Sequence, residues 1–332
     1  MSQMRAARFV ELGRMECEMV ELPNIAEGDL LVKTEMASIC GSDLHTVFHG
    51  VMRTDFPQVP GYPGHEGVGE VVESKHPGFR PGDRVLCCPA PLEARTFAEL
   101  QRIKGGYCIK LPEYKGPVSH LLMAQQLGTV IFALRQRPVD LVGRNVMVQG
   151  QGSAGLFFAY LAKRAGAAKV IVSDLSEARL AASRALGGAD VALKSDGKRG
   201  SAHIKEAVLE QTGGEGVDFL VEAVGSKVSL LEAVDLVRIG ADMLMFGLPD
   251  TGDVVNYNFH DFFRKKLVMS STYGAQEEPG RVSFKMALDM IASGEIDVSP
   301  LVSHVFPVEQ VQEAMLMAHE RSDNALKVSL SF

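Results

Sequence analysis

Two short segments near the N-terminus carry side chains that could bind a metal ion. Cys40 opens the run Cys-Gly-Ser-Asp-Leu-His at residues 40–45, and Gly-His-Glu follows at residues 64–66. A Cys thiolate, the His65 imidazole and the Glu66 carboxylate are ligand types that zinc accepts, and a catalytic zinc keeps one position open for water or substrate. Such an ion polarises an alcohol oxygen and lowers the pKa of the alcohol. The pattern therefore favours a catalytic metal site formed by these three residues.

Three further side chains lie close to the ligands in the sequence. The Ser42 hydroxyl can pass on the proton of an alcohol, and His45 can relay it to solvent. Asp43 can accept a hydrogen bond from the ring nitrogen of His65 that does not bind the metal. Each residue also has a structural interpretation, because a lone Cys is commonly a small buried residue. Taken singly, none of these residues distinguishes the two interpretations.

A glycine-rich turn in the middle of the chain predicts a dinucleotide site. Gly150, Gly152 and Gly155 form the pattern G-x-G-x-x-G, directly after a predicted strand and at the start of a predicted helix. The first glycine permits a tight turn, the second lets the backbone approach a pyrophosphate, and the third lets the helix pack closely on the strand. The N–H groups of the first helical turn, which includes Ser153 and Ala154, then face the phosphates.

An acidic residue at the end of the next predicted strand fits the same site. Asp174 follows Gly155 by 19 residues, close to the ~20 typical of dinucleotide-binding units. Its carboxylate can accept hydrogen bonds from an adenosine ribose and repels a 2′-phosphate, which favours NAD over NADP. Arg179 is placed to lie along the adenosine, although an exposed helix position explains it equally well. The structural alternative is a plain glycine turn with Asp174 as a helix N-cap.

Two differently built domains must position these residues. Residues 5–115 contain short strand-like runs separated by turns rich in Pro and Gly, which predicts a β-rich N-terminal domain. From Asn145 strands alternate with helices, which predicts an α/β fold with a doubly wound parallel sheet. The predicted strands are 145–149, 169–173, 217–222, 243–246, 267–271 and 327–332, and the predicted helices are 119–137, 154–165, 177–186, 281–294 and 308–319.

Composition and charge narrow the function classes. The 332 residues are 46% hydrophobic and 23% charged, as in ordinary globular proteins. A formal net charge of −7 without a long basic run disfavours nucleic acid as a partner. Apolar runs fall far short of the ~20 residues that span a membrane, so no membrane partner is expected. The five scattered cysteines argue against a secreted disulfide framework, and we expect a cytoplasmic protein.

With the candidate metal ligands followed along the chain by the dinucleotide-binding turn, the chain resembles a zinc-dependent medium-chain dehydrogenase/reductase of the alcohol and polyol dehydrogenase type. The resemblance covers nearly the whole length. Besides the segments already described, it is carried by Gly-Tyr-Pro-Gly-His-Glu-Gly-Val-Gly at 61–69, Pro-Gly-Asp-Arg-Val at 81–85, residues 217–225 and residues 301–307. It implies a GroES-like catalytic domain made of residues 1–125 and 271–332, and a Rossmann NAD-binding domain made of residues 126–270.

The resemblance also implies an activity. It is the reversible, NAD-dependent and zinc-dependent oxidation of a secondary alcohol, such as a polyol, cyclitol or amino alcohol, to a ketone. The resemblance places Val224 and Leu248 near the nicotinamide and Lys327 facing the pyrophosphate, and it implies a homodimer or homotetramer. Two alternatives stay open, namely a zinc-independent NAD(P)-dependent reductase of the same superfamily and a non-catalytic nucleotide-binding protein derived from it.

Two departures from the family pattern matter. The lobe that binds a structural zinc through four closely spaced cysteines is missing, and Cys87, Cys88 and Cys108 lack that spacing, so we expect a single zinc. The third catalytic ligand of the family is usually a Cys or a Glu, whereas this chain has Gln125 at that position. A neutral amide is a weak zinc ligand, so we expect Gln125 to position the water. The same substitution would also fit a weak or lost metal site.

Overall fold

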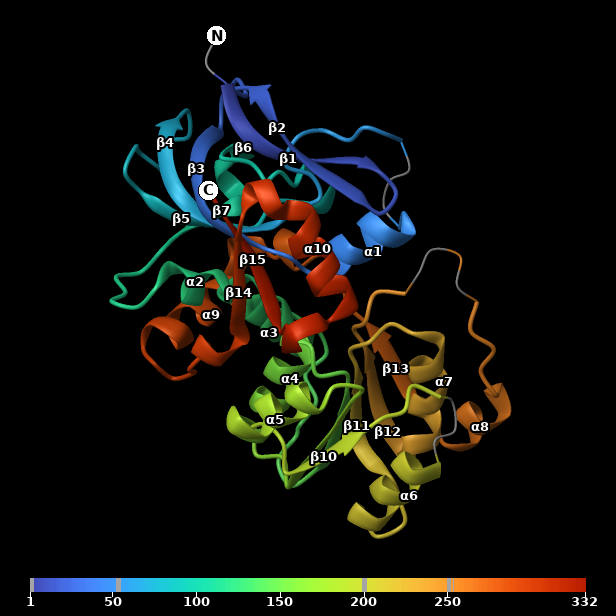
Figure 1. Cartoon of the computed structure of the whole chain (residues 1–332). Coiled ribbons are helices and arrows are strands. Elements are labelled where there is room, and N and C mark those ends of the chain that lie inside the picture. Colours follow the sequence, from blue (N-terminus) through green and yellow to red (C-terminus); the bar gives the residue numbers. More distant parts are fainter. Residues whose placement is uncertain (1–2, 52–54, 199–201, 250–251, 253) are drawn as a thin grey trace. The chain divides into compact units, whose positions relative to one another are not determined.

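The computed structural model describes the whole chain except residues 1–2, 52–54, 199–201, 250–251 and 253 (Figure 1). The chain forms two compact units. Unit 1 comprises Met1–Ile131 and Gly274–Phe332, and unit 2 comprises Phe132–Tyr273. The chain thus leaves the first unit, builds the second and returns to the first.

Unit 1 contains a seven-stranded sheet built from residues 29–110 and from the C-terminal strands β14 and β15 (Figure 1). The strand order is β14-β15-β3-β4-β5-β7, and β6 also pairs with β3. The C-terminal strand lies antiparallel to β3, with Ser329 opposite Ser38. The strands are β3 (Asp29–Ser38), β4 (Glu66–Ser74), β5 (Arg84–Cys87), β6 (Leu100–Lys104), β7 (Cys108–Lys110), β14 (Val302–Pro307) and β15 (Lys327–Ser331).

A second, two-stranded sheet and several helices complete unit 1. Strands β1 (Gln3–Glu11) and β2 (Arg14–Glu21) are antiparallel, and their apolar side chains pack with those of the C-terminal helix in one buried cluster. The predicted helix over 119–137 is divided at Met123. The helices are α1 (Gly41–His49), α2 (Val118–Leu122), α3 (Ala124–Gln136), which continues into unit 2, α9 (Val282–Ala292) and α10 (Val311–Glu320).

Unit 2 is the predicted doubly wound sheet. All six strands are parallel in the order β10-β9-β8-β11-β12-β13, which is the Rossmann order. The strands are β8 (Asn145–Gln149), β9 (Lys169–Asp174), β10 (Val191–Lys194), β11 (Val217–Glu222), β12 (Val237–Met245) and β13 (Val268–Ser271). The helices are α4 (Ser153–Arg164), α5 (Glu177–Ala185), α6 (Ala202–Gln211), α7 (Lys227–Leu236) and α8 (Phe259–Arg264).

Helices cover both faces of the parallel sheet. Val146, Met147 and Val148 of β8 are all fully buried. Because successive strand residues point to opposite faces, this is possible only when both faces are covered. In the described part of the chain, no helix combines the length and the apolar character needed to cross a bilayer.

The pairing of β3 with β4 depends on a glycine. Gly69 lies opposite Thr34, and a Cβ atom at Gly69 would overlap the backbone carbonyl of Lys33. We expect Gly69→Ala to lower the melting temperature by about 5 °C or more, because the two strands would have to separate. Gly106→Ala is the matched control, since a Cβ there has no atom within 4 Å. Thermal unfolding followed by circular dichroism measures both, and equal melting temperatures would contradict the prediction.

Candidate functional site

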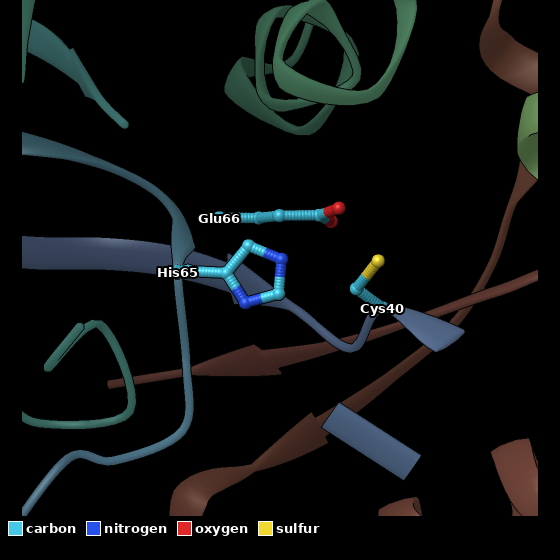
Figure 2. Close-up of side chains that lie close together, drawn as sticks. All are labelled: Cys40, His65 and Glu66. Atoms are coloured by element: carbon cyan, nitrogen blue, oxygen red, sulfur yellow. The ribbon is translucent and has the colours of Figure 1, made fainter. Parts of the chain in front are cut away.

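Three potential metal ligands converge in unit 1. One ligand atom each from Cys40, His65 and Glu66 lies within 4.8 Å of the others, and Figure 2 shows the side chains pointing toward one another. The sheet register explains the convergence. Glu66, the first residue of β4, lies opposite Ser38, the last residue of β3. Cys40 follows two residues after Ser38, at the N-terminus of α1, and therefore reaches the neighbours of Glu66.

The carboxylate of Asp43 holds two of the three ligands in place. Its Oδ1 lies 2.9 Å from Nδ1 of His65, and its Oδ2 accepts a hydrogen bond of 2.9 Å from the backbone N–H of Cys40. Asp43 is only 1% exposed, so the arrangement is shielded from water. A donor interaction at Nδ1 leaves Nε2 of His65 available to bind a metal. Burial alone would lower the pKa of His65, but the charge and hydrogen bond of Asp43 hold it well above its ordinary value.

The two carboxylate oxygens of Glu66 have different surroundings. Its Oε2 accepts hydrogen bonds from the hydroxyl of Ser38 and from Nζ of Lys327, which is 2.5 Å away. Its Oε1 is buried and has no hydrogen-bond partner. Burial alone would raise the pKa of Glu66, but the charge of Lys327, assisted by His65 and by both hydrogen bonds, holds it below its ordinary value. Glu66 is therefore a buried, ionised carboxylate with one free oxygen.

A divalent cation fits this arrangement. A buried acceptor without a partner costs about 1–3 kcal/mol, and a bound cation would remove that cost at Oε1 of Glu66. Thiolate, imidazole and carboxylate together suit zinc, which forms catalytic sites with three protein ligands and one open position. The residues present thus fit the ion that the sequence predicts, with Cys40, His65 and Glu66 as its ligands.

An amide also reaches the cluster, and it belongs to Gln126. Its Oε1 lies 3.4 Å from Nζ of Lys327 and 4.0 Å from Sγ of Cys40. Gln125, to which the sequence assigns the role of positioning water, is buried and its backbone carbonyl accepts a hydrogen bond from Thr129. Our sequence analysis did not identify Gln126 or Ser38. Helix phase and strand register bring these two residues to the cluster, and residue types alone do not reveal either.

The two predicted proton-relay residues lie on α1. Oγ of Ser42 is 3.4 Å from Nε2 of His65, on the side of the ring where a metal would bind. His45 is half-buried one turn along the helix, and its ring centroid lies 5.2 Å from that of the exposed His49. Ser42 is thus beside the ligand cluster, and His45 lies farther along α1, where it is partly exposed to solvent.

The glycine-rich turn of unit 2 has the features required for a dinucleotide-binding turn. Gly150 has a φ of +84°, and a Cβ there would lie 2.7 Å from the Val224 side chain. A Cβ at Gly155 would overlap the carbonyl oxygen of Gly150, so α4 packs directly on the turn. Gly152 is the N-cap of α4, and Ser153 is its first residue. Ser153 and Ala154 are partly exposed, so the first turn of this 12-residue helix is accessible, and helix N-termini are places where proteins bind phosphate.

Asp174 ends β9 and contacts the same turn. Its carboxylate accepts hydrogen bonds from the backbone N–H of Gln151 at 2.6 Å and of Ser176 at 2.8 Å. The helix N-cap is Ser176, which accepts from the N–H of Arg179, so Asp174 is not the cap. An Nη atom of Arg179 lies 3.9 Å from where a Cβ of Gly152 would be, which places the guanidinium beside the turn.

The remaining predicted cofactor residues fall into different units. Val224 lies against Gly150, and the Leu248 carbonyl lies against Gly225 at the same edge of the sheet in unit 2. The buried carboxylate of Glu222 holds this edge by accepting the N–H groups of Val224 and Gly225. Lys327 belongs to unit 1, where it is 2% exposed and paired with Glu66 at the ligand cluster.

Two family models match the chain, one within unit 1 and one over most of unit 2 and the start of the segment that returns to unit 1. Residues 26–124 match the model described as alcohol dehydrogenase GroES-like domain. Residues 154–293 match the model described as zinc-binding dehydrogenase. Together they cover the predicted metal ligands and most of the predicted cofactor residues.

Several curated proteins and solved structures are similar over most or all of their lengths. An L-threonine 3-dehydrogenase of Enterobacter sp. (strain 638) is 30% identical, covering 93% of this chain and 94% of the relative. Human sorbitol dehydrogenase is 28% identical, covering 91% and 89%. An alcohol dehydrogenase of Thermus sp. ATN1 has the same fold, with a TM-score of 0.84 at 24% identity over 99% of this chain and 100% of the other. A 2R,3R-butanediol dehydrogenase from Bacillus subtilis also has a TM-score of 0.84, at 22% identity over 99% of each chain.

The role of Asp43 can be tested by metal binding alone. We expect Asp43→Asn to weaken zinc or cobalt binding by about 10–100-fold, because the orienting charge on His65 is lost while the shape is kept. Competition with a chromophoric chelator measures the affinity. Asp297→Asn, at an exposed aspartate of the same unit, is the control and should bind as wild type does. Unchanged affinity in Asp43→Asn would show that Asp43 does not support a metal ligand.

Proposed function

This chain belongs to the zinc-type medium-chain alcohol dehydrogenases, and on that premise we propose that it is an NAD-dependent, zinc-dependent oxidoreductase of secondary alcohols. Its substrate is a polyol, cyclitol or amino alcohol, which it converts reversibly to a ketone. The observation that carries the proposal is the cluster of Cys40, His65 and Glu66 with one unpartnered carboxylate oxygen. The relatives named for threonine and sorbitol support the substrate class, because both compounds carry a secondary hydroxyl.

The side chains of unit 1 hold the metal and handle the proton. Zinc, when bound, supplies the Lewis acidity that lowers the pKa of the alcohol, and NAD supplies the hydride acceptor. Asp43 keeps His65 oriented with Nε2 toward the ligand cluster. The Ser42 hydroxyl, 3.4 Å from that nitrogen, receives the alcohol proton. His45, farther along the same helix and partly exposed, transfers it to solvent.

Lys327 and Ser38 prepare Glu66 for its role as a ligand. Both donate to Oε2, which leaves Oε1 for the metal. The ammonium group also keeps the buried carboxylate ionised, because an isolated buried charge would take up a proton instead. The contacts of Lys327 thus support a role at the metal centre. Gln126 accepts from Lys327 and fixes the ammonium group beside Glu66.

Asp174 supports NAD as the cofactor. Its carboxylate is held at the glycine-rich turn, where a ribose 2′-phosphate would meet a negative charge. We expect Asp174→Asn to raise the ratio of kcat/KM for NADP to that for NAD by about tenfold or more, since juxtaposed like charges cost several kcal/mol. The single amide oxygen of Asn can keep one of the two hydrogen bonds that Asp174 accepts, the one from the N–H of Gln151 in the turn. Asp235→Asn, at an exposed position of α7, should leave the ratio unchanged, and an unchanged ratio in Asp174→Asn would oppose the assignment.

The main test combines metal analysis with a panel of alcohols. We expect one zinc per chain and NADH formation with secondary alcohols in the wild-type protein. Cys40→Ala should lose the metal and at least about 10³-fold of the activity, because metal catalysis supplies several kcal/mol. Cys17→Ala, at a strand residue of the two-stranded sheet, is the control and should retain both.

Two outcomes would each replace the proposal with a different function. Full turnover after exhaustive chelation would make the protein a zinc-independent reductase. Tight NAD binding without turnover across the whole panel would make it a non-catalytic nucleotide-binding protein.

A further inference from the structure

Two cysteines that the metal centre does not use face each other across neighbouring strands. Cys87 of β5 and Cys108 of β7 are direct partners in an antiparallel register. The N–H of Cys88 donates to the carbonyl of Tyr107 at 2.9 Å, one residue beyond the pair on each strand. This pattern identifies Cys87 and Cys108 as a non-hydrogen-bonded pair, the type in which opposing side chains are closest.

The geometry of such a pair suits a disulfide bond. Non-hydrogen-bonded partners have Cα atoms about 4.5 Å apart, inside the range of about 4.4–6.8 Å found for disulfides. The adjacent Cys88 does not have this relation to Cys108, because successive residues of an extended chain point to opposite sides.

The surroundings of the pair allow oxidation while limiting its rate. Both side chains lie in a buried apolar cluster, with Cys87 0% and Cys108 8% exposed. Burial and the neighbouring thiols raise the pKa of Cys108, and the charge of Arg281 opposes this rise. Strand β7 has only three residues and forms one end of the main strand order, so it can open locally more easily than the central strands. Local opening gives a small oxidant access to the thiols.

We propose that Cys87 and Cys108 form an oxidisable dithiol that a hydroperoxide converts to an intramolecular disulfide. One thiolate attacks the peroxide, the O–O bond breaks, and an alcohol (or water, from hydrogen peroxide) leaves with the proton of that thiol. The second thiol then attacks the sulfenic acid, the S–S bond forms, and water leaves. Two thiols lose two electrons in total, and one peroxide is reduced.

The bond would lie one strand away from the metal centre. Cys87 also pairs with Gly67 of β4, the residue that follows Glu66. The disulfide would therefore tie the edge strand β7 to the strand that flanks the carboxylate ligand, and it would close a loop of about 20 residues. A cross-link of this kind stabilises the folded chain. We expect the melting temperature of the full chain to rise by about 5 °C on oxidation and to return on reduction.

The experiment treats the purified full chain with hydrogen peroxide, blocks remaining thiols, and maps a non-reducing tryptic digest by mass spectrometry. Cleavage after Arg84, Arg95, Lys104 and Lys110 places Cys87 and Cys108 in separate peptides. Because Cys88 shares the peptide of Cys87, the matched variants are Cys88→Ala and Cys87→Ala. We expect the linked peptide pair in wild type and Cys88→Ala, and its absence in Cys87→Ala.

A variant that folds poorly does not obscure the result. The wild-type protein alone reports the link, and fragmentation of the linked peptide assigns it to Cys87 or Cys88. Linkage through Cys88 would overturn the proposal. Two unmodified thiols at Cys87 and Cys108 after treatment that oxidises other cysteines of the chain would also overturn it. A melting temperature that rises on oxidation in wild type, but not in Cys108→Ala, would support it independently.

Discussion

The ion pair between Glu66 and Lys327 is the constraint on which unit 1 depends. Both side chains are almost completely buried, and a buried charge is tolerated only with a partner. Lys327 begins the last strand, Glu66 begins β4, and β3 lies between them and supplies Ser38. The C-terminal segment must therefore return to the N-terminal sheet, since without it the carboxylate would be left unpaired. Removing one partner alone is expected to be far more damaging than replacing both.

Strands β15, β3 and β4 also position the candidate metal ligands. Register places Glu66 opposite Ser38, and the turn after β3 then brings Cys40 to His65. Asp43 links the two, so one carboxylate orients an imidazole and a cysteine backbone together. A metal ion would complete a group of charges that the protein has already assembled. In unit 2, parallel strands perform the equivalent task, because their carboxyl ends bring Gly150 and Asp174 to one edge.

Much of this could be predicted from local sequence. The strand-turn-helix around Gly150 and the strand ending at Asp174 appear where their residue patterns indicate. Strand β10 and helices α6 and α7 were not predicted. Strand β10 has only four residues, none of them buried, and α7 follows the N-cap Ser226, a start signal that our sequence analysis did not use. We assigned a role to Gln125 from its position in the family motif. The amide near Cys40 is instead that of Gln126. Helix phase decides which of these two adjacent glutamines faces the site.

By itself the sequence determined the donor types, the glycine turn and the order of the two domains, because these follow from residue chemistry and short-range spacing. Only the tertiary structure decided the partners of those donors. It paired Lys327 with Glu66 across 261 positions, left one carboxylate oxygen free, and brought Cys87 opposite Cys108. Strand register and burial produce these contacts, and both depend on how distant segments pack, which residue types and local spacing do not encode.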